Sequence, residues 1–500
     1  MQTFSTALPI LLTLALSYFL ALSASRKRTS VHATSYLFGG NSPALAVSSG
    51  VGSIFSFSIA ATALVSGGYL YGWQVIPPLA LGASLGTILL YRIYGSSAAA
   101  AFKTATKADS LRGGASYLRM VAPVFGRRVA QPLALLLLVS HFLMLTLELS
   151  LVKLVLVSTT SFTPMDLVVI LITVVGICYA YVYVGGYRGV LLTDHFQLWT
   201  IILLLGVCIG QSDAVNTLFM PEPLPTRGAI HWPSFLNIVL LHASVVSGGF
   251  LFSAGSLDQW YRTAGTLPLP QAKRVLRISL ALYSLGGIPL VLVGNAAHRW
   301  GLTAEGPLNQ ISLTLLQRGL TLAPPSLQFA LLVVLTCILL TTIDTHIITL
   351  QQLYYETALG TSDQSGARKV LRRFLGPQQI RVFAALAVTL STTIVLLAGE
   401  KLVFRAGLAV LSAPGFLAPI LFLVGFPESR LARALDSPRA LGAAFLLSVA
   451  LFPPLLSLFV RLQGPLDEHL YLICGAALFA QVAGYGITAL VRCAQQKRSR

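Results

Sequence analysis

Charged side chains are scarce in this chain of 500 residues. They make up 10% of it, Asp and Glu together number 16, and hydrophobic residues account for 55%. A soluble domain of this size needs more charged and polar surface than this to remain in water. The composition therefore excludes a large soluble protein and indicates a polytopic membrane protein that lies in the lipid bilayer.

Long polar segments and reactive clusters are missing as well. None of the connections between apolar runs is large enough for a separate soluble domain, so we expect residues 1–500 to form a single transmembrane domain. The five cysteines lack metal-type and disulfide-type spacing. No His/Asp, Cys/His or metal-type cluster falls in the apolar runs, so we expect a protein that is not an enzyme.

The basic residues, which give the chain a net charge of +18, are confined mainly to short loops. There they report membrane topology, so we expect no nucleic-acid partner. Most of the 34 Lys and Arg residues fall on one side if the N-terminus is outside. The first apolar run has no basic residue before it and Arg26-Lys27-Arg28 after it, which predicts a retained helix instead of a signal peptide. We expect a multi-pass protein of the plasma (cytoplasmic) membrane, with the N-terminus outside and the C-terminus inside.

Thirteen apolar runs are long enough to cross about 30 Å of hydrocarbon. They cover residues 7–25, 43–68, 73–96, 130–157, 166–186, 190–211, 234–257, 277–298, 327–355, 380–399, 402–425, 439–461 and 469–491. Two groups of five, over residues 43–211 and 234–425, start on opposite sides of the membrane. This pattern predicts an inverted repeat, preceded by an extra helix at 7–25 and followed by two C-terminal helices at 439–491.

Both groups of five begin with a run that Ser and Gly interrupt. The first interruption extends from Ser48 to Ser58, and the second from Ser244 to Ser256. Because freed backbone groups in hydrocarbon need partners, such paired breaks indicate a binding site near the middle of the membrane. The alternative is that the small residues only let neighbouring helices pack closely.

Carboxylates inside apolar runs are costly and therefore indicate function. Three lie deep in such runs: Glu148, Asp194 and Asp344. Helical spacing places Thr341 and Thr345 on the same face as Asp344. Hydroxyl and carbonyl oxygens are suitable ligands for a hard monovalent cation, although threonines can instead bond to their own helix carbonyls.

The chain resembles the sodium:solute symporter family over most of its length. The most specific segment is Gly185-Gly186 followed by Thr193-Asp194 and Gln197, which is similar to a signature of that family. The segments Thr341-Thr342-Ile343-Asp344-Thr345 and Asp258-Gln259-Trp260-Tyr261-Arg262 and the segment Ser412-Ala413-Pro414-Gly415 are similar to further family motifs. The resemblance implies an all-α integral membrane fold of about thirteen transmembrane helices, a LeuT-like five-plus-five inverted repeat with broken first and sixth core helices.

The resemblance also implies two cation sites. The principal sodium site would take the Val51, Ile54 and Ile338 carbonyls with the Thr341 and Thr342 hydroxyls. A second site would take Asp194, Asp344 and Thr345. Because Asp344 adds a second carboxylate close to Asp194, this site could hold either a second sodium ion or a shared proton.

The solute site implied by the resemblance lacks the side chains that sugar transporters use. Small or apolar residues stand at those positions, which are Ser53, Ser58, Ser256, Leu285 and Ala406. A sugar would leave hydroxyls unpaired there, so a small, partly apolar solute suits the site better. The expected solute-binding residues are Ser53, Phe57, Ser58, Phe252 and Ser256. Glu148 and Arg405 are further candidates, with pairing to His141 or a nearby hydroxyl the alternative for Glu148 and snorkelling to the outer interface the alternative for Arg405.

These features predict a secondary active transporter that couples sodium to uptake of a small-molecule solute, such as an amino acid or a monocarboxylate, by alternating access. Two alternatives remain: a proton-coupled or uncoupled transporter of the same fold, and a non-transporting membrane sensor or subunit.

Overall fold

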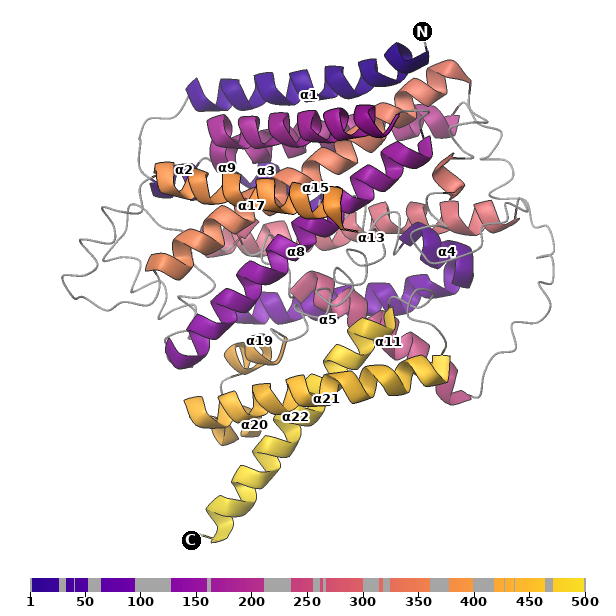
Figure 1. The fold of residues 1–500 in the computed structure, drawn as a ribbon. Coiled ribbons are helices and arrows are strands. Elements are labelled where there is room, and N and C mark those ends of the chain that lie inside the picture. The colour runs from indigo at the N-terminus through magenta and orange to yellow at the C-terminus, as the bar shows by residue number, and fades with distance from the viewer. Residues whose placement is uncertain are drawn as a thin grey trace.

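The computed structural model describes most of the chain. The described residues are 2–26, 33–39, 41–52, 64–94, 127–159, 163–210, 235–254, 261–263, 267–299, 314–317, 324–359, 377–398, 418–426, 428–435, 437–463 and 471–498. Every named regular element in these ranges is a helix (Figure 1). In chain order they are α1 (Gln2–Arg26), α2 (Ala33–Phe38), α3 (Pro43–Gly52), α4 (Ser66–Tyr71), η3 (Gly72–Val75), α5 (Ile76–Ile93), α8 (Arg127–Thr159), α9 (Pro164–Gly210), α11 (Phe235–Ala254), α13 (Leu269–Arg299), α15 (Pro325–Leu359), α17 (Pro377–Leu397), α19 (Ala418–Gly425), α20 (Arg430–Ala434), α21 (Pro438–Gln463) and α22 (Tyr471–Arg498).

Proline begins several of these helices, because its fixed φ suits the first helical position and its missing N–H would be unpaired there in any case. It does so in α3, α9, α15, α17 and α21. Each of these starts lies within a few residues of the corresponding predicted span. The local chemistry of the chain therefore sets where these helices begin.

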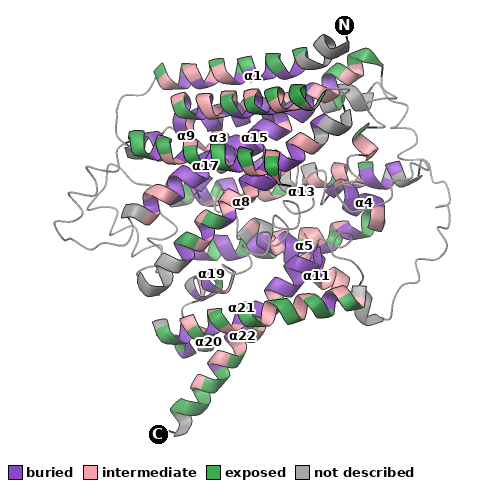
Figure 2. Cartoon of the chain, in the orientation of Figure 1, coloured by how far each residue is buried: buried purple, intermediate pink, exposed green. Residues whose placement is uncertain are grey.

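Eight helices in the described part of the chain are long and apolar enough to cross a membrane. Large apolar side chains are exposed on their outer faces, among them Phe19 (65%), Leu386 (66%) and Leu490 (72%). Figure 2 shows such exposed positions along α1 and α21, at opposite edges of the helix assembly. Contact between so many apolar side chains and water would be unfavourable. The chain is therefore a multi-pass membrane protein. The total of thirteen spans stays a prediction.

Gly186 divides α9 into two helical arms that meet at a bend. The element runs for 47 residues, about 70 Å if it were straight, which is more than twice the thickness of the hydrocarbon layer. Gly186 breaks it with φ 58° and ψ −156°, a backbone conformation that glycine adopts without a steric penalty. Tyr181 and Thr193 would be about 18 Å apart along a straight helix, yet both donate to the same oxygen of Asp344. The predicted spans 166–186 and 190–211 are the two arms of this bend.

Glycines bring two further helix pairs into backbone contact. A Cβ atom on Gly68 of α4 would collide with the Val291 carbonyl of α13, and one on Gly294 of α13 would collide with the Val65 carbonyl before α4. The same holds for Gly82 of α5 and Gly249 of α11, which meet the carbonyls of Val246 and Leu79. We call these contacts the glycine seams. Close packing, which was the alternative reading of the Ser/Gly-rich run at 244–256, accounts for Gly249.

The helix α15 packs against α1, α8, α9 and α17, in the half of the assembly that carries the N-terminus (Figure 1). Leu335, Leu339, Ile343 and Ile347 of this helix belong to the largest apolar cluster of the described residues. The polar face of the same helix carries Thr341, Asp344 and Thr345, all buried. Of these polar residues, Thr341 and Asp344 lie within hydrogen-bond reach of α9.

Candidate cation and solute site

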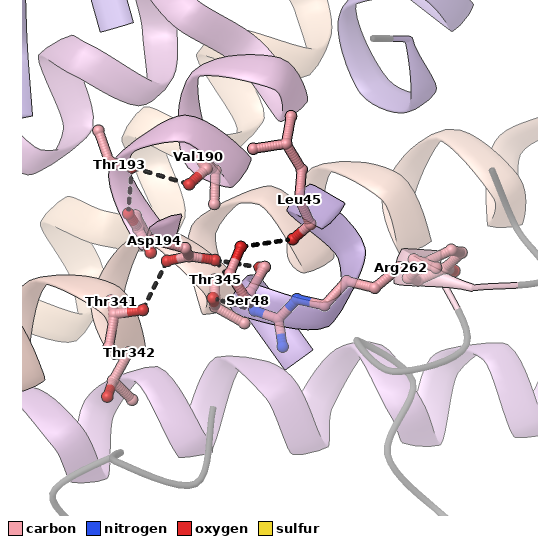
Figure 3. A network of polar contacts seen from close by, with 12 residues as sticks. Leu45, Ser48, Val190, Thr193, Asp194, Arg262, Thr341, Thr342 and Thr345 are labelled. Atoms are coloured by element: carbon pink, nitrogen blue, oxygen red, sulfur yellow. Dashed lines mark hydrogen bonds and ion pairs between the residues drawn. The ribbon is translucent and has the colours of Figure 1, made fainter. Parts of the chain in front are cut away.

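Asp194 is the centre of a buried polar cluster (Figure 3). It lies about two turns after the break at Gly186 in α9 and is 0% exposed. Its Oδ1 accepts a hydrogen bond from Thr341 Oγ1 at 2.5 Å, and its Oδ2 accepts one from Ser49 Oγ. Arg262 Nη2 lies 3.4 Å from the same Oδ2. Three separate parts of the chain therefore meet at one carboxylate.

The bend at Gly186 produces this arrangement. It returns α9 toward α15, so that Thr193 and Asp194, neighbours in sequence, reach two different residues of the same helix. Thr193 Oγ1 donates to Asp344 Oδ2 at 3.2 Å, while Asp194 accepts from Thr341. The segment Gly185-Gly186…Thr193-Asp194, which the sequence singles out, is thus one structural unit.

Asp344 is buried and only partly satisfied. Its Oδ2 accepts hydrogen bonds from Tyr181 at 2.7 Å and from Thr193. Its Oδ1 is buried and has no hydrogen-bond partner among the described residues. A buried carboxylate oxygen in this state can take a proton or a cation ligand, and either would lower the cost of burying the charge.

The C-terminal end of α3 abuts the cluster. Ser48 Oγ lies 2.9 Å from His195 Nδ1, and the next residue, Ser49, bonds to Asp194. A Cβ atom on Gly52 would come within 3.5 Å of Thr341 Oγ1. The buried Val51 at this helix end packs in an apolar cluster with Val334 and Cys337 of α15, and its role in a sodium site stays a prediction. Ile54 lies outside the described residues.

The two threonine hydroxyls suit a cation. Thr342 Oγ1 donates to the Ile338 carbonyl at 2.9 Å, and Thr341 Oγ1 donates to Asp194. A hydroxyl that has committed its single proton in this way still offers its lone pairs. Thr342 thus makes the hydrogen bond to its own helix that is the alternative to a ligand role. The bond uses the hydroxyl proton and leaves the oxygen lone pairs able to bind sodium.

Arg262 is the residue that sequence reasoning missed. It is 3% exposed, and its Nη2 also donates to Thr345 Oγ1 at 2.6 Å. In the sequence it stands out only as part of the motif Asp258–Arg262. Two carboxylates predicted to lie close together in a membrane interior imply a nearby cation, and this is the signal that could have found it.

Tyr261, the preceding residue, is fixed in the same way. Its hydroxyl donates to Glu356 Oε2 at 3.0 Å, and its carbonyl accepts from Tyr187 at 3.1 Å. Burial, together with the neighbouring Glu356, raises the pKa of the Tyr261 phenol well above its usual value. The phenol therefore keeps its proton and remains a donor.

The structure describes little of the predicted solute site. Ser53, Phe57, Ser58, Ser256 and Arg405 lie outside the described residues, as do Leu285 and Ala406 in side chain or in full. Phe252 lies on α11, but its side chain is not among those described. Glu148 is buried on α8. The solute-binding roles of these residues therefore stay predictions.

No family model matches the chain, and no curated protein sequence matches it. Among solved structures, the fold is similar to a substrate-bound, outward-open Na⁺-coupled sialic acid symporter with a TM-score of 0.66 and 14% identity, over 97% of each chain. It is also similar to a nucleobase-cation-symport-1 family transporter in a closed conformation, with a TM-score of 0.49 and 15% identity, over 93% of this chain and 96% of the other. Both matched proteins are transporters by name. The first match confirms the all-α, LeuT-like fold, whereas membership of the sodium:solute symporter family stays a prediction.

Proposed function

We propose that this protein is a secondary active transporter that couples sodium entry to the uptake of a small organic solute by alternating access. The observation that supports this most directly is that hydroxyl groups of two helices, Ser49 of α3 and Thr341 of α15, both donate to the buried carboxylate of Asp194. The fold in which they do so is similar to that of a Na⁺-coupled symporter. A cation bound between the two helices would hold them together.

Sodium is a transported substrate in this proposal. It would bind to the Val51, Ile54 and Ile338 carbonyls and to the Thr341 and Thr342 hydroxyls. Because these ligands belong to α3 and α15, bound sodium favours the conformation in which the two helices are close. Loss of that conformation lowers the affinity for sodium.

The solute would bind next to the sodium ion, at Ser53, Phe57, Ser58, Phe252 and Ser256. Two aromatic rings and three hydroxyls suit a compact solute with one apolar side, such as an amino acid or a monocarboxylate. A half-helix N-terminus at either break could receive its carboxylate. Coupling requires that each ligand increase the affinity for the other.

Solute uptake into proteoliposomes tests the proposal. A thermal-shift screen of purified protein against amino acids, carboxylates, sugars and osmolytes, in sodium and in potassium, first identifies a solute. Uptake of that solute should then depend on an inward sodium gradient and collapse when potassium replaces sodium. Uptake that instead follows a proton gradient would support proton coupling, for which the unpartnered Asp344 Oδ1 is a suitable site. Binding without uptake would support a sensor or subunit.

A further inference from the structure

The second cation site expected from the resemblance already contains a positive charge. Two of its three residues, Asp194 and Thr345, are both contacted by Nη2 of Arg262, at 3.4 Å and 2.6 Å. Figure 3 shows the guanidinium reaching into the cluster beside Ser48 and Thr345. Sodium at this site would need the same carboxylate and hydroxyl oxygens.

In both contacts, an oxygen atom presents a lone pair to the guanidinium, as it would to a bound metal cation. The carboxylate Oδ2 of Asp194 faces the guanidinium, and Thr345 Oγ1 accepts a hydrogen bond and so presents a lone pair. An oxygen that presents a lone pair to a guanidinium would present the same lone pair to sodium. Two of the three residues expected to hold a second sodium ion, Asp194 and Thr345, therefore bind the guanidinium instead.

The backbone around Arg262 holds this charge in place. Asn41 Nδ2 donates to the Arg262 carbonyl at 2.9 Å, and Tyr187 donates to the Tyr261 carbonyl. Tyr94 of α5 and Thr263 share a hydrogen bond of 2.5 Å. These anchors come from three separate parts of the chain, so the guanidinium is positioned by the fold and is not a mobile surface group.

Charge balance also favours a single sodium ion at this cluster. The contacts described above join two carboxylates, Asp194 and Asp344, and one guanidinium. If both acids are ionised, one further monovalent cation makes the cluster neutral, and neutrality is strongly favoured in a membrane interior. A second sodium ion would leave an uncompensated positive charge.

We infer that Arg262 is a tethered cation that takes the place of a second sodium ion, so that the protein binds one sodium ion instead of two. This inference rests on the proposed sodium coupling and adds its stoichiometry. It also assigns Arg262 as the residue that determines that stoichiometry. Removing the guanidinium should open the site formed by Asp194, Asp344 and Thr345 to a second sodium ion.

Binding of ²²Na⁺ to purified protein in nanodiscs tests the inference without requiring transport. The wild type should bind one ion per chain with a hyperbolic isotherm. Arg262→Ser should bind two ions per chain. Arg262→Lys keeps a positive charge and should still bind one ion.

Arg381→Ser is the matched control, because Arg381 also lies against aromatic rings in the membrane domain, with its guanidinium carbon 4.2 Å from the Tyr183 ring centre, but takes no part in the cluster contacts described above. It should leave the sodium stoichiometry at one. Two sodium ions in the wild type, or a single ion in a folded Arg262→Ser protein, would overturn the inference while sodium coupling stands. If Arg262→Ser does not fold, two sodium ions bound to the wild type would still overturn the inference. No sodium binding by any of these proteins would overturn both proposals.

Discussion

A hydroxyl group carries one proton and two lone pairs, and this asymmetry decides what Thr341 and Thr342 can do. Each has committed its proton, Thr341 to a carboxylate and Thr342 to its own helix. Both oxygens are therefore acceptors for anything else that approaches. Among the described residues, no hydrogen-bond donor is recorded on either oxygen. Their lone pairs are therefore available to a cation.

Thr342→Ala should weaken sodium binding by about tenfold, because one ligand oxygen is lost and about 1.4 kcal/mol corresponds to that factor. The measurement is the sodium concentration that gives half of the maximal thermal stabilisation. Thr336→Ala is the control: Thr336 lies on the same helix, is buried, and makes the same kind of back-bond, to Leu332 at 2.7 Å. Equal sodium dependence in both variants would contradict a ligand role for Thr342.

Tyr181→Phe should destabilise the protein by about 1–3 kcal/mol, because it removes a donor from the buried Asp344 and leaves the acceptor short of partners. Unfolding in denaturant, followed in detergent, measures this difference. Tyr485→Phe is the comparison, since Tyr485 is buried in an apolar cluster and the described residues give its hydroxyl no hydrogen bond. A loss no larger than that of Tyr485→Phe would show that the Tyr181 bond contributes little.

At the scale of elements, the bend in α9 has the greatest effect on the site. Gly186→Ala introduces a Cβ atom at positive φ, and we expect it to lower stability by about 1–2 kcal/mol and to weaken sodium binding as Thr193 and Asp194 shift. Thermal unfolding and the sodium titration described above report the two effects separately. Gly176→Ala lies on the same element with open space around the new methyl group, and it should be neutral or slightly stabilising.

The helices were predictable from the sequence because they depend on local features: apolar runs of membrane length, glycines at a break and prolines at helix starts. The common face of Thr341, Asp344 and Thr345 follows from helical periodicity alone. The position of Arg262 does not, since it lies 68 residues from Asp194 and 83 from Thr345. Its burial depends on anchors from distant segments, and no local pattern encodes them. The glycine seams are likewise visible as glycines in the sequence but not as pairs.

For the whole molecule, sodium should act as a stabilising ligand. A ligand that binds only the folded protein at a hundred times its dissociation constant adds about 2.7 kcal/mol to stability. The melting temperature should therefore rise with sodium concentration at constant ionic strength, with potassium replacing sodium as the control. A melting temperature that depends only on total salt would argue against a specific sodium site.

The glycine seams determine where the assembly can deform. At α4/α13 and α5/α11 two main chains touch directly, without long side chains between them that could change rotamer. Because η3 also connects α4 to α5 along the chain, we expect these four helices to move together. The contacts of Ser49, Thr341 and Arg262 with Asp194 are of another kind, since they consist of side-chain hydrogen bonds that can be exchanged one at a time. We therefore expect rearrangement to begin at the contacts of Asp194, beside which the sodium ion is proposed to bind.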